Sequence, residues 1–252
     1  MTQNVYDNPG FFEAYSRLPR SQLGLDGAPE WPTLRAMLPP LAGARVLDLG
    51  CGYGWFSRWA RAAGAGTVLG VDVSERMLAR AQTDTTDSAV TYLRADLERY
   101  APPAAAFDLA YSSLAFHYLE GLGAHLQRIH AALVPTGRLV FSVEHPLMTA
   151  PDAPDWSADA KGRPVWPVRG YLDEGQRTTD WLAKGVIKQH RTIGTYVALL
   201  RTAGFSVTDL CEWGPSEEQV EAHPEWKKER ERPFFLLLGC ERQAAGNCGG
   251  GR

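Results

Sequence analysis

The feature that most constrains this chain is a short apolar segment that runs directly into closely spaced glycines. Residues 45–49 read Arg-Val-Leu-Asp-Leu, and Gly50, Gly52 and Gly54 follow at alternate positions. Glycine permits a sharp turn out of a strand and lets another molecule approach the backbone where a Cβ would intrude. A second apolar segment, 67–73, includes an acidic residue near its end. Together these segments predict a parallel α/β sheet that binds a nucleotide at the carboxyl ends of its strands.

The glycine spacing narrows the kind of nucleotide. A dinucleotide-binding turn reads G-x-G-x-x-G, and its third glycine packs the helix against the strand. Here the pattern is G-x-G-x-G, and Trp55 occupies the position of that third glycine. Its indole would crowd the helix start that a pyrophosphate uses. A P-loop is excluded because no Gly-Lys-Ser/Thr follows. The motif therefore favours an adenosine-containing cofactor. The Asp72 carboxylate could accept hydrogen bonds from the ribose hydroxyls of that cofactor.

Strand-like and helix-like segments alternate through the chain. We expect strands at residues 45–49, 67–73, 90–95, 107–112, 138–143, 205–211 and 233–240. We expect helices at residues 55–63, 75–82, 122–133 and 193–203. Ser74 is a predicted N-cap and Gly204 a predicted C-cap. This alternation predicts a parallel sheet covered by helices on both faces.

The core is flanked and interrupted by segments of different composition. We expect one domain over residues 1–242, with a helical N-terminal extension at 1–44 and a disordered Gly-rich tail at 243–252. Residues 148–191 form a long connection rich in proline and aromatic residues. Long connections are usually functional, and aromatic side chains suit a pocket wall, so we expect a lid. The alternative is a structural insertion whose tryptophans form a small core of their own.

Composition excludes several classes of partner. The formal net charge is −3, which leaves no basic surplus to neutralise a nucleic-acid backbone. No run of about 18 apolar residues and no secretory leader is visible. The four cysteines, Cys51, Cys211, Cys240 and Cys248, lack C-x-x-C spacing. We therefore expect reduced thiols, no metal site, a cytoplasmic location, a monomer or homodimer, and neither nucleic-acid nor membrane partners.

Three of these segments resemble a known family. Residues 48–54, Asp72 and residues 95–97 (Ala-Asp-Leu) resemble the cofactor motifs of class I S-adenosylmethionine-dependent methyltransferases. The resemblance covers roughly residues 41–143. Residues 141–146 and 188–192 resemble bacterial small-molecule methyltransferases related to the ubiquinone/menaquinone type. The resemblance implies a Rossmann-like three-layer sandwich with a mostly parallel seven-stranded sheet whose last strand is antiparallel. It also implies S-adenosylmethionine as cofactor and S-adenosylhomocysteine as product.

The resemblance assigns cofactor contacts to individual residues. Asp72 would bind the ribose and Asp96 the adenine amino group, although either carboxylate could instead cap a helix. Asp48 and Ser112 would lie near the methionine end, and Arg20 could reach the methionine carboxylate. The full set of expected cofactor residues is Tyr15, Arg20, Asp48, Gly50, Cys51, Gly52, Gly54, Asp72, Val73, Asp96, Leu97 and Ser112.

Candidate catalytic residues follow two later strands, where the acceptor pocket is expected. An imidazole is suited to accept a proton at neutral pH. We expect His145 to act as a base with Glu144 orienting it, and His117 is the second candidate. Positioning alone would suffice for an acceptor that is already deprotonated. The expected substrate-binding residues are Tyr118, Trp156, Tyr171, Trp181, His190 and Arg191.

The expected reaction is methyl transfer to an oxygen, nitrogen or carbon atom of a small, aromatic or heterocyclic metabolite. The segment after residue 112 lacks the Asp/Asn-Pro-Pro-Tyr/Phe motif of nucleic-acid amino-methyltransferases, and the chain lacks the Pro-Cys pair used for pyrimidine methylation. Two alternatives stay open from the residues alone. One is an NAD-dependent oxidoreductase on a related fold, and the other is a non-catalytic S-adenosylmethionine-binding protein.

Overall fold

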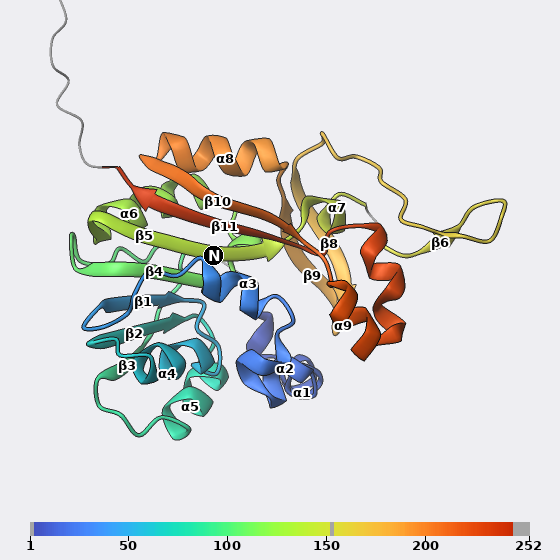
Figure 1. The fold of residues 1–252 in the computed structure, drawn as a ribbon. Helices are drawn as coiled ribbons and strands as arrows, with labels where there is room; N and C mark the ends of the chain where they lie inside the picture. Colours follow the sequence, from blue (N-terminus) through green and yellow to red (C-terminus); the bar gives the residue numbers. More distant parts are fainter. Residues whose placement is uncertain (1–2, 152–153, 244–252) are drawn as a thin grey trace, which may run out of the picture.

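A seven-stranded sheet forms the centre of the molecule (Figure 1). The computed structural model describes residues 3–151 and 154–243. The strands are, in spatial order, β10 (Phe205–Trp213), β11 (Phe235–Arg242), β5 (Leu133–Glu144), β4 (Phe107–Ser113), β1 (Arg45–Leu49), β2 (Thr67–Asp72) and β3 (Val90–Arg94). β5, β4, β1, β2 and β3 pair in parallel, whereas β11 is antiparallel to both of its neighbours. The predicted mostly parallel sheet with an antiparallel last strand is confirmed.

Helices cover both faces of this sheet because its central strands bury side chains on both sides. In β1 every residue after Arg45 is buried, as expected for a continuous apolar run in a parallel sheet. Helices α6 (Leu122–Ala132) and α8 (Ile193–Thr202) pack into the core on one face. On the other face, α3 (Trp31–Ala36) and α4 (Trp55–Ala62) complete a second core. The result is the predicted three-layer sandwich.

The loop ends of the parallel strands are shaped by short local interactions. Helix α5 (Glu75–Thr83) begins at Ser74, whose side chain accepts a hydrogen bond from the Met77 N–H, as predicted. The turn η3 (Phe116–Tyr118) follows β4. Between β10 and β11 lie α9 (Glu217–Ala222) and η4 (Pro224–Glu231). None of the helices in the described part of the chain is both long and apolar enough to cross a bilayer.

The N-terminal extension contains several short elements. They are η1 (Val5–Asp7), α1 (Pro9–Ser16), α2 (Pro19–Gln22) and η2 (Gly24–Gly27), followed by α3. Asn8 separates η1 from α1, because its side chain accepts hydrogen bonds from the first-turn N–H groups of Gly10 and Phe11. Proline at the first position of α1 lacks an N–H and suits that start.

The long connection after β5 contains strands that the sequence analysis did not predict. Helix α7 (Pro146–Thr149) comes first, and β6 (Ser157–Ala158) then pairs with β7 (Pro164–Val165). A longer hairpin follows, in which β8 (Gly175–Trp181) pairs with β9 (Ala183–His190). Figure 1 shows the β6 segment extending away from the sheet. Apart from Gln243, the predicted tail at 243–252 lies outside the described residues, as does Cys248.

Candidate active site

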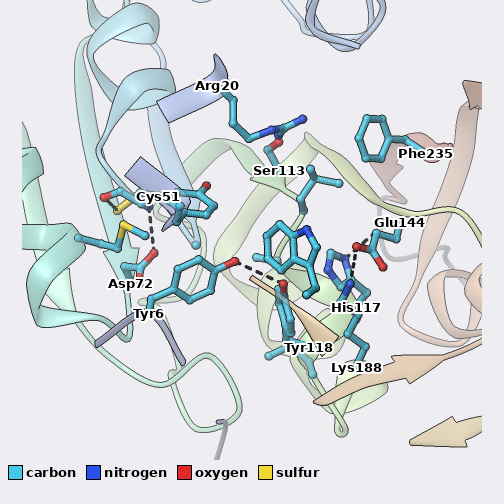
Figure 2. Close-up of a pocket in the computed structure, with 18 of the residues that line it drawn as sticks. Tyr6, Arg20, Cys51, Asp72, Ser113, His117, Tyr118, Glu144, Lys188 and Phe235 are labelled. Atoms are coloured by element: carbon cyan, nitrogen blue, oxygen red, sulfur yellow. Dashed lines mark hydrogen bonds and ion pairs between the residues drawn. The ribbon is translucent and has the colours of Figure 1, made fainter. Parts of the chain in front are cut away.

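A cavity of about 860 Å³ lies where the carboxyl ends of the parallel strands meet the N-terminal extension and the β8–β9 hairpin (Figure 2). It has two parts. The glycine-loop side is lined by the loop at 50–53 and by the ends of β2 and β3. The insertion side is lined by residues that follow β4, by the end of β5 and by the β8–β9 hairpin. Because one cavity joins the two parts, a ligand on one side can lie against a ligand on the other.

Asp72 forms the centre of the glycine-loop side. Its Oδ2 accepts a hydrogen bond from the Gly52 N–H at 2.9 Å, and its Oδ1 accepts one from the Ser74 N–H at 2.9 Å. A carboxylate offers about four acceptor positions, so capacity is left for a ligand's hydroxyl groups. Burial raises the pKa of Asp72 despite these two hydrogen bonds. Asp72 therefore both fixes the glycine loop and presents a carboxylate to the cavity.

Asp48 lies deeper on the same side and is almost fully buried. Its Oδ2 accepts a hydrogen bond from the Ser57 hydroxyl at 2.6 Å. Burial raises the pKa of Asp48 to about 7, and the hydrogen bond from Ser57 opposes that rise in part. A cation placed beside this group would favour its ionised form.

The backbone of the glycine loop leaves room for a cofactor. Gly50 and Gly52 both have positive φ, and a Cβ added at Gly52 would meet nothing within 4 Å. A Cβ at Gly54 would instead collide with the Tyr92 hydroxyl, so Gly54 allows Tyr92 to pack and does not line the cavity. The loop thus provides an open cradle at Gly52, which fits a ligand held against the backbone.

Two side chains offer donors to the far end of this cradle. Arg20 lines the cavity and is paired with the buried Glu30 at 3.0 Å. Trp55 also lines the cavity, and its indole N–H is buried without a hydrogen-bond partner among the described residues. A buried N–H is normally satisfied, so an acceptor group of a ligand fits here. In the sequence, the position of Trp55 argues only against a pyrophosphate, and no pattern there indicates that its N–H lines the cavity.

Most of the residues expected to bind the cofactor line the cavity. Ser112 is an exception: it is buried, and its hydroxyl donates to the Leu49 carbonyl at 2.7 Å, whereas the neighbouring Ser113 lines the cavity. The expected residues that line it are Tyr15, Arg20, Asp48, Gly50, Cys51, Gly52, Asp72, Val73, Asp96 and Leu97.

The insertion side contains a compact group of charged and polar side chains. Glu144 ends β5, and its Oε1 accepts a hydrogen bond from Lys188 Nζ at 2.6 Å (Figure 2). Lys188 comes from β9 and is buried. Although burial alone would raise the pKa of Glu144, the Lys188 ammonium helps to lower it through its charge and its hydrogen bond. Glu144 is therefore a carboxylate, and its Oε2 has no hydrogen-bond partner among the described residues.

His117 stands next to this pair and is kept neutral. Burial lowers its pKa to about 4, and Lys188 and Arg191 add to that effect. Its Nδ1 accepts a long hydrogen bond, 3.4 Å, from the Glu144 N–H. The proton of a neutral imidazole then resides on Nε2. In this tautomer His117 offers a donor, so it fits a positioning role better than that of a base.

The structure places His145 outside the cavity, contrary to the sequence expectation. Successive residues of an extended chain point to opposite faces, so Glu144 and His145 cannot both face the same pocket. His145 is buried, its Nδ1 accepts from the Leu147 N–H at 3.1 Å, and its Nε2 lies 3.0 Å from Glu212 Oε1. It caps α7 and does not line the cavity with Glu144.

The expected substrate-binding residues divide in the same way. Tyr118 and Trp181 line the cavity. Trp156 instead packs against Trp166, with the Arg232 guanidinium 5.0 Å from its ring centroid, in a cluster of its own. The remaining three expected residues, Tyr171, His190 and Arg191, do not line the cavity either.

His190 and Arg191 hold the insertion in place. The His190 ring contacts the Thr149 hydroxyl at 2.8 Å and the Tyr171 carbonyl at 2.9 Å. Arg191 donates to the carbonyls of Leu119 and Glu120 at 2.5 and 2.8 Å. The His190 contacts fix the end of β9 against α7, and the Arg191 contacts fix it against the loop after β4, so both residues position the cavity wall.

The N-terminal segment connects the two sides of the cavity. The Gln3 side chain bonds the β9 backbone twice, donating to the Gly185 carbonyl and accepting from the Ile187 N–H, each at 2.9 Å. Asp7 accepts from the Ser74 hydroxyl at 2.6 Å at the start of α5. Tyr6, between them, lines the cavity and lies 3.4 Å from the Tyr118 hydroxyl. The sequence pattern gave no signal for these contacts, because they join segments far apart in the chain.

The fold and the cavity together define a class of protein. The strand order, the glycine cradle and the carboxylates at the ends of β2 and β3 form the cofactor half of a class I S-adenosylmethionine-dependent methyltransferase. Residues 46–137 match a family described as a methyltransferase domain.

Two known proteins are similar to this chain over most of its length, and a third is similar over less than half of it. A crystal structure of an S-adenosylmethionine dependent methyltransferase from Mesorhizobium loti is 53% identical, covers 87% of this chain and 100% of that chain, and has a TM-score of 0.85. A Haemophilus influenzae protein, described as uncharacterized, is 33% identical over 93% of this chain and 95% of its own length. A malonyl-[acyl-carrier protein] O-methyltransferase of Enterobacter lignolyticus is 39% identical over 43% of this chain and 42% of its own length. The chain therefore belongs to the class I S-adenosylmethionine-dependent methyltransferases, and S-adenosylmethionine is its cofactor. This family sets aside the NAD-dependent alternative.

Proposed function

We propose that the chain methylates a small, aromatic or heterocyclic metabolite on the insertion side of the cavity. The observation that carries the proposal is the continuity of the cavity between Asp72 and the Glu144–Lys188 pair. Aromatic side chains in the wall, among them Tyr118 and Trp181, suit a planar acceptor. The net charge of −3 supports a small molecule over a nucleic acid as the substrate.

The chain's own residues on the glycine-loop side would hold the cofactor. Asp72 would accept hydrogen bonds from the ribose hydroxyls, and Asp96 and Leu97 would line the adenine end. Arg20 and the Trp55 indole N–H would donate to the methionine carboxylate, and Asp48 would balance positive charge nearby. When bound, the cofactor supplies an electrophilic methyl group on a sulfonium. None of these contacts uses a residue of the insertion side, so those residues stay available to bind the acceptor.

On the insertion side, Glu144 and His117 would orient the acceptor. A free Glu144 Oε2 can accept the acceptor's O–H or N–H hydrogen, and the His117 Nε2–H can donate to a second polar atom of it. During methyl transfer, Glu144 or solvent would take up the acceptor's proton. Holding the two reactants in line accounts for much of the rate in such a displacement.

The test combines binding and turnover on the purified chain. S-Adenosylhomocysteine should raise the melting temperature, and NAD should not. The protein is then incubated with S-adenosylmethionine and a panel of phenols, aromatic acids and heterocyclic amines, and S-adenosylhomocysteine is measured by mass spectrometry. Turnover of a small aromatic acceptor supports the proposal. Tight cofactor binding with turnover of a carrier protein or an RNA, and none of the panel, would overturn it.

A further inference from the structure

Lys188 places a cation inside the acceptor part of the cavity. Its side chain is 6% exposed, and its Nζ lies 2.6 Å from Glu144 Oε1. The same ammonium lies 5.1 Å from the centroid of the Trp181 ring. Figure 2 shows Lys188 and Glu144 pointing toward one another beside His117. The ammonium therefore touches a carboxylate and faces an aromatic ring in the wall of the cavity.

A carboxylate beside an aromatic ring is an environment that favours ammonium ligands. In this cavity Glu144 and Trp181 form such an environment, and the chain's own ammonium occupies it. A cationic acceptor that approached Glu144 would compete with the buried Lys188 ammonium for the same carboxylate and would meet its like charge with little water to screen the repulsion. Proteins commonly exclude an unwanted ligand by placing a like charge where that ligand would bind.

We infer that Lys188 determines acceptor specificity by excluding protonated amines and quaternary ammonium compounds, in favour of acceptors that present an oxygen to the site as a hydroxyl or a carboxylate. The inference rests on the proposed function, because it names the acceptor class of the same site. The hydrogen-bond donors on this side of the cavity also support the inference. The remaining N–H groups of Lys188 and the Nε2–H of neutral His117 can hold an acceptor oxygen, whereas a protonated amine would have to share the Glu144 carboxylate with the Lys188 ammonium.

The test uses three small aromatic probes that differ in charge: benzyltrimethylammonium, benzyl alcohol and benzoate. Their binding to the chain saturated with S-adenosylhomocysteine is measured by calorimetry and saturation-transfer NMR. For the wild-type chain we expect benzyl alcohol or benzoate to bind more tightly than benzyltrimethylammonium. The opposite ranking overturns the inference without any variant.

Variants then locate the effect. Lys188→Met keeps an apolar stem against Trp181 and removes the charge, so benzyltrimethylammonium should bind about tenfold more tightly or better. Lys184→Met, an exposed lysine of the same strand, is the matched control and should leave the ranking unchanged. Adding Glu144→Gln to Lys188→Met should remove the gain, because the carboxylate that attracts the probe is lost.

The outcomes separate this inference from the proposed function. A folded Lys188→Met chain that gains no affinity for the ammonium probe, or an equal gain in Lys184→Met, overturns the inference. Should Lys188→Met fail to fold, the wild-type ranking decides. Binding of S-adenosylhomocysteine is measured in every variant by thermal shift. Its absence in the wild-type chain would refute the proposed function itself.

Discussion

The two sides of the cavity are built in different ways. On the glycine-loop side, the contributing residues sit at the ends of adjacent parallel strands, and pairing in register places the Asp72 end of β2 beside the Arg94 end of β3. On the insertion side, Glu144 and Lys188 are 44 residues apart and meet because the β8–β9 hairpin folds back over the sheet. Cofactor binding therefore depends on local strand-end geometry, whereas the acceptor side depends on docking of the insertion. Changes on one side should therefore leave the other side intact.

The largest effect is expected from Asp72→Asn. It removes the charge of the hydrogen-bonding group on the glycine-loop side and replaces one of its two oxygens with an NH2 group, so either the Gly52 or the Ser74 N–H loses its acceptor. Charge-assisted hydrogen bonds are about twice as strong as neutral ones, so affinity for S-adenosylhomocysteine should fall about 100-fold. Calorimetry measures it, with Asp84→Asn, at the far end of α5, as the control. An affinity within threefold of wild type would refute the role of Asp72.

Glu144→Gln should separate the two sides. It leaves the Lys188 ammonium buried without a counter-charge, so the free energy of unfolding should fall by about 2 kcal/mol. Affinity for S-adenosylhomocysteine should stay within about twofold, because no glycine-loop contact changes. Urea unfolding with and without the ligand measures both quantities, and Glu218→Gln on α9 is the control. A loss of cofactor affinity as large as that of Asp72→Asn would contradict the division into two sides.

Cofactor affinity should depend on pH through Asp48. Its pKa is raised to about 7 in the ligand-free chain, well above the ordinary value of 3.8. The stability that the protonated group contributes is therefore present below about pH 4 and is lost as the pH rises to about 7. A bound cation favours ionised Asp48, so affinity for S-adenosylmethionine should rise with pH up to about 7, by at most about tenfold per unit, and then level off. Calorimetry between pH 5.5 and 8 tests this. An Asp48→Asn chain with the same pH profile as wild type would assign the effect to another group.

The smallest effect is expected from His145→Ala. The side chain caps α7 and lies outside the cavity, so stability should fall by about 1 kcal/mol. Affinity for S-adenosylhomocysteine and the ranking of the three aromatic probes should not change. His223→Ala, an exposed histidine, is the control. A change in the ranking of the three probes without a change in stability would show that His145 takes part in acceptor binding.

The glycine-loop side could be predicted because its signals are local. Residues 48–54 and Asp72 lie within one strand–helix–strand unit, and parallel pairing then fixes their positions. The sequence pattern did not show which of two neighbouring side chains faces the cavity. Ser113 lines it and Ser112 does not, and Glu144 does while His145 does not. Neighbouring side chains in an extended chain point in opposite directions, so an error of one position assigns the site to the wrong side chain.

The insertion side could be predicted only in part, because its contacts are long-range. Trp181 was identified from composition, but Trp156 from the same segment packs in a separate cluster with Arg232. Lys188 lies in a segment that the sequence analysis noted, yet His190 and Arg191 were preferred as contacts to the acceptor. Their hydrogen bonds to Thr149 and to the loop after β4 depend on how the hairpin docks. No periodicity in the sequence reports such docking.

The most direct test is a crystal structure of the chain with S-adenosylhomocysteine bound. We expect the ribose at Asp72, the adenine beside Asp96, and the sulfur facing the insertion side. Glu144 and His117 should then lie within about two hydrogen-bond lengths, roughly 6 Å, of the position in line with the sulfur. A ligand bound at the glycine loop whose sulfur faces away from Glu144, His117 and Lys188 would contradict the account.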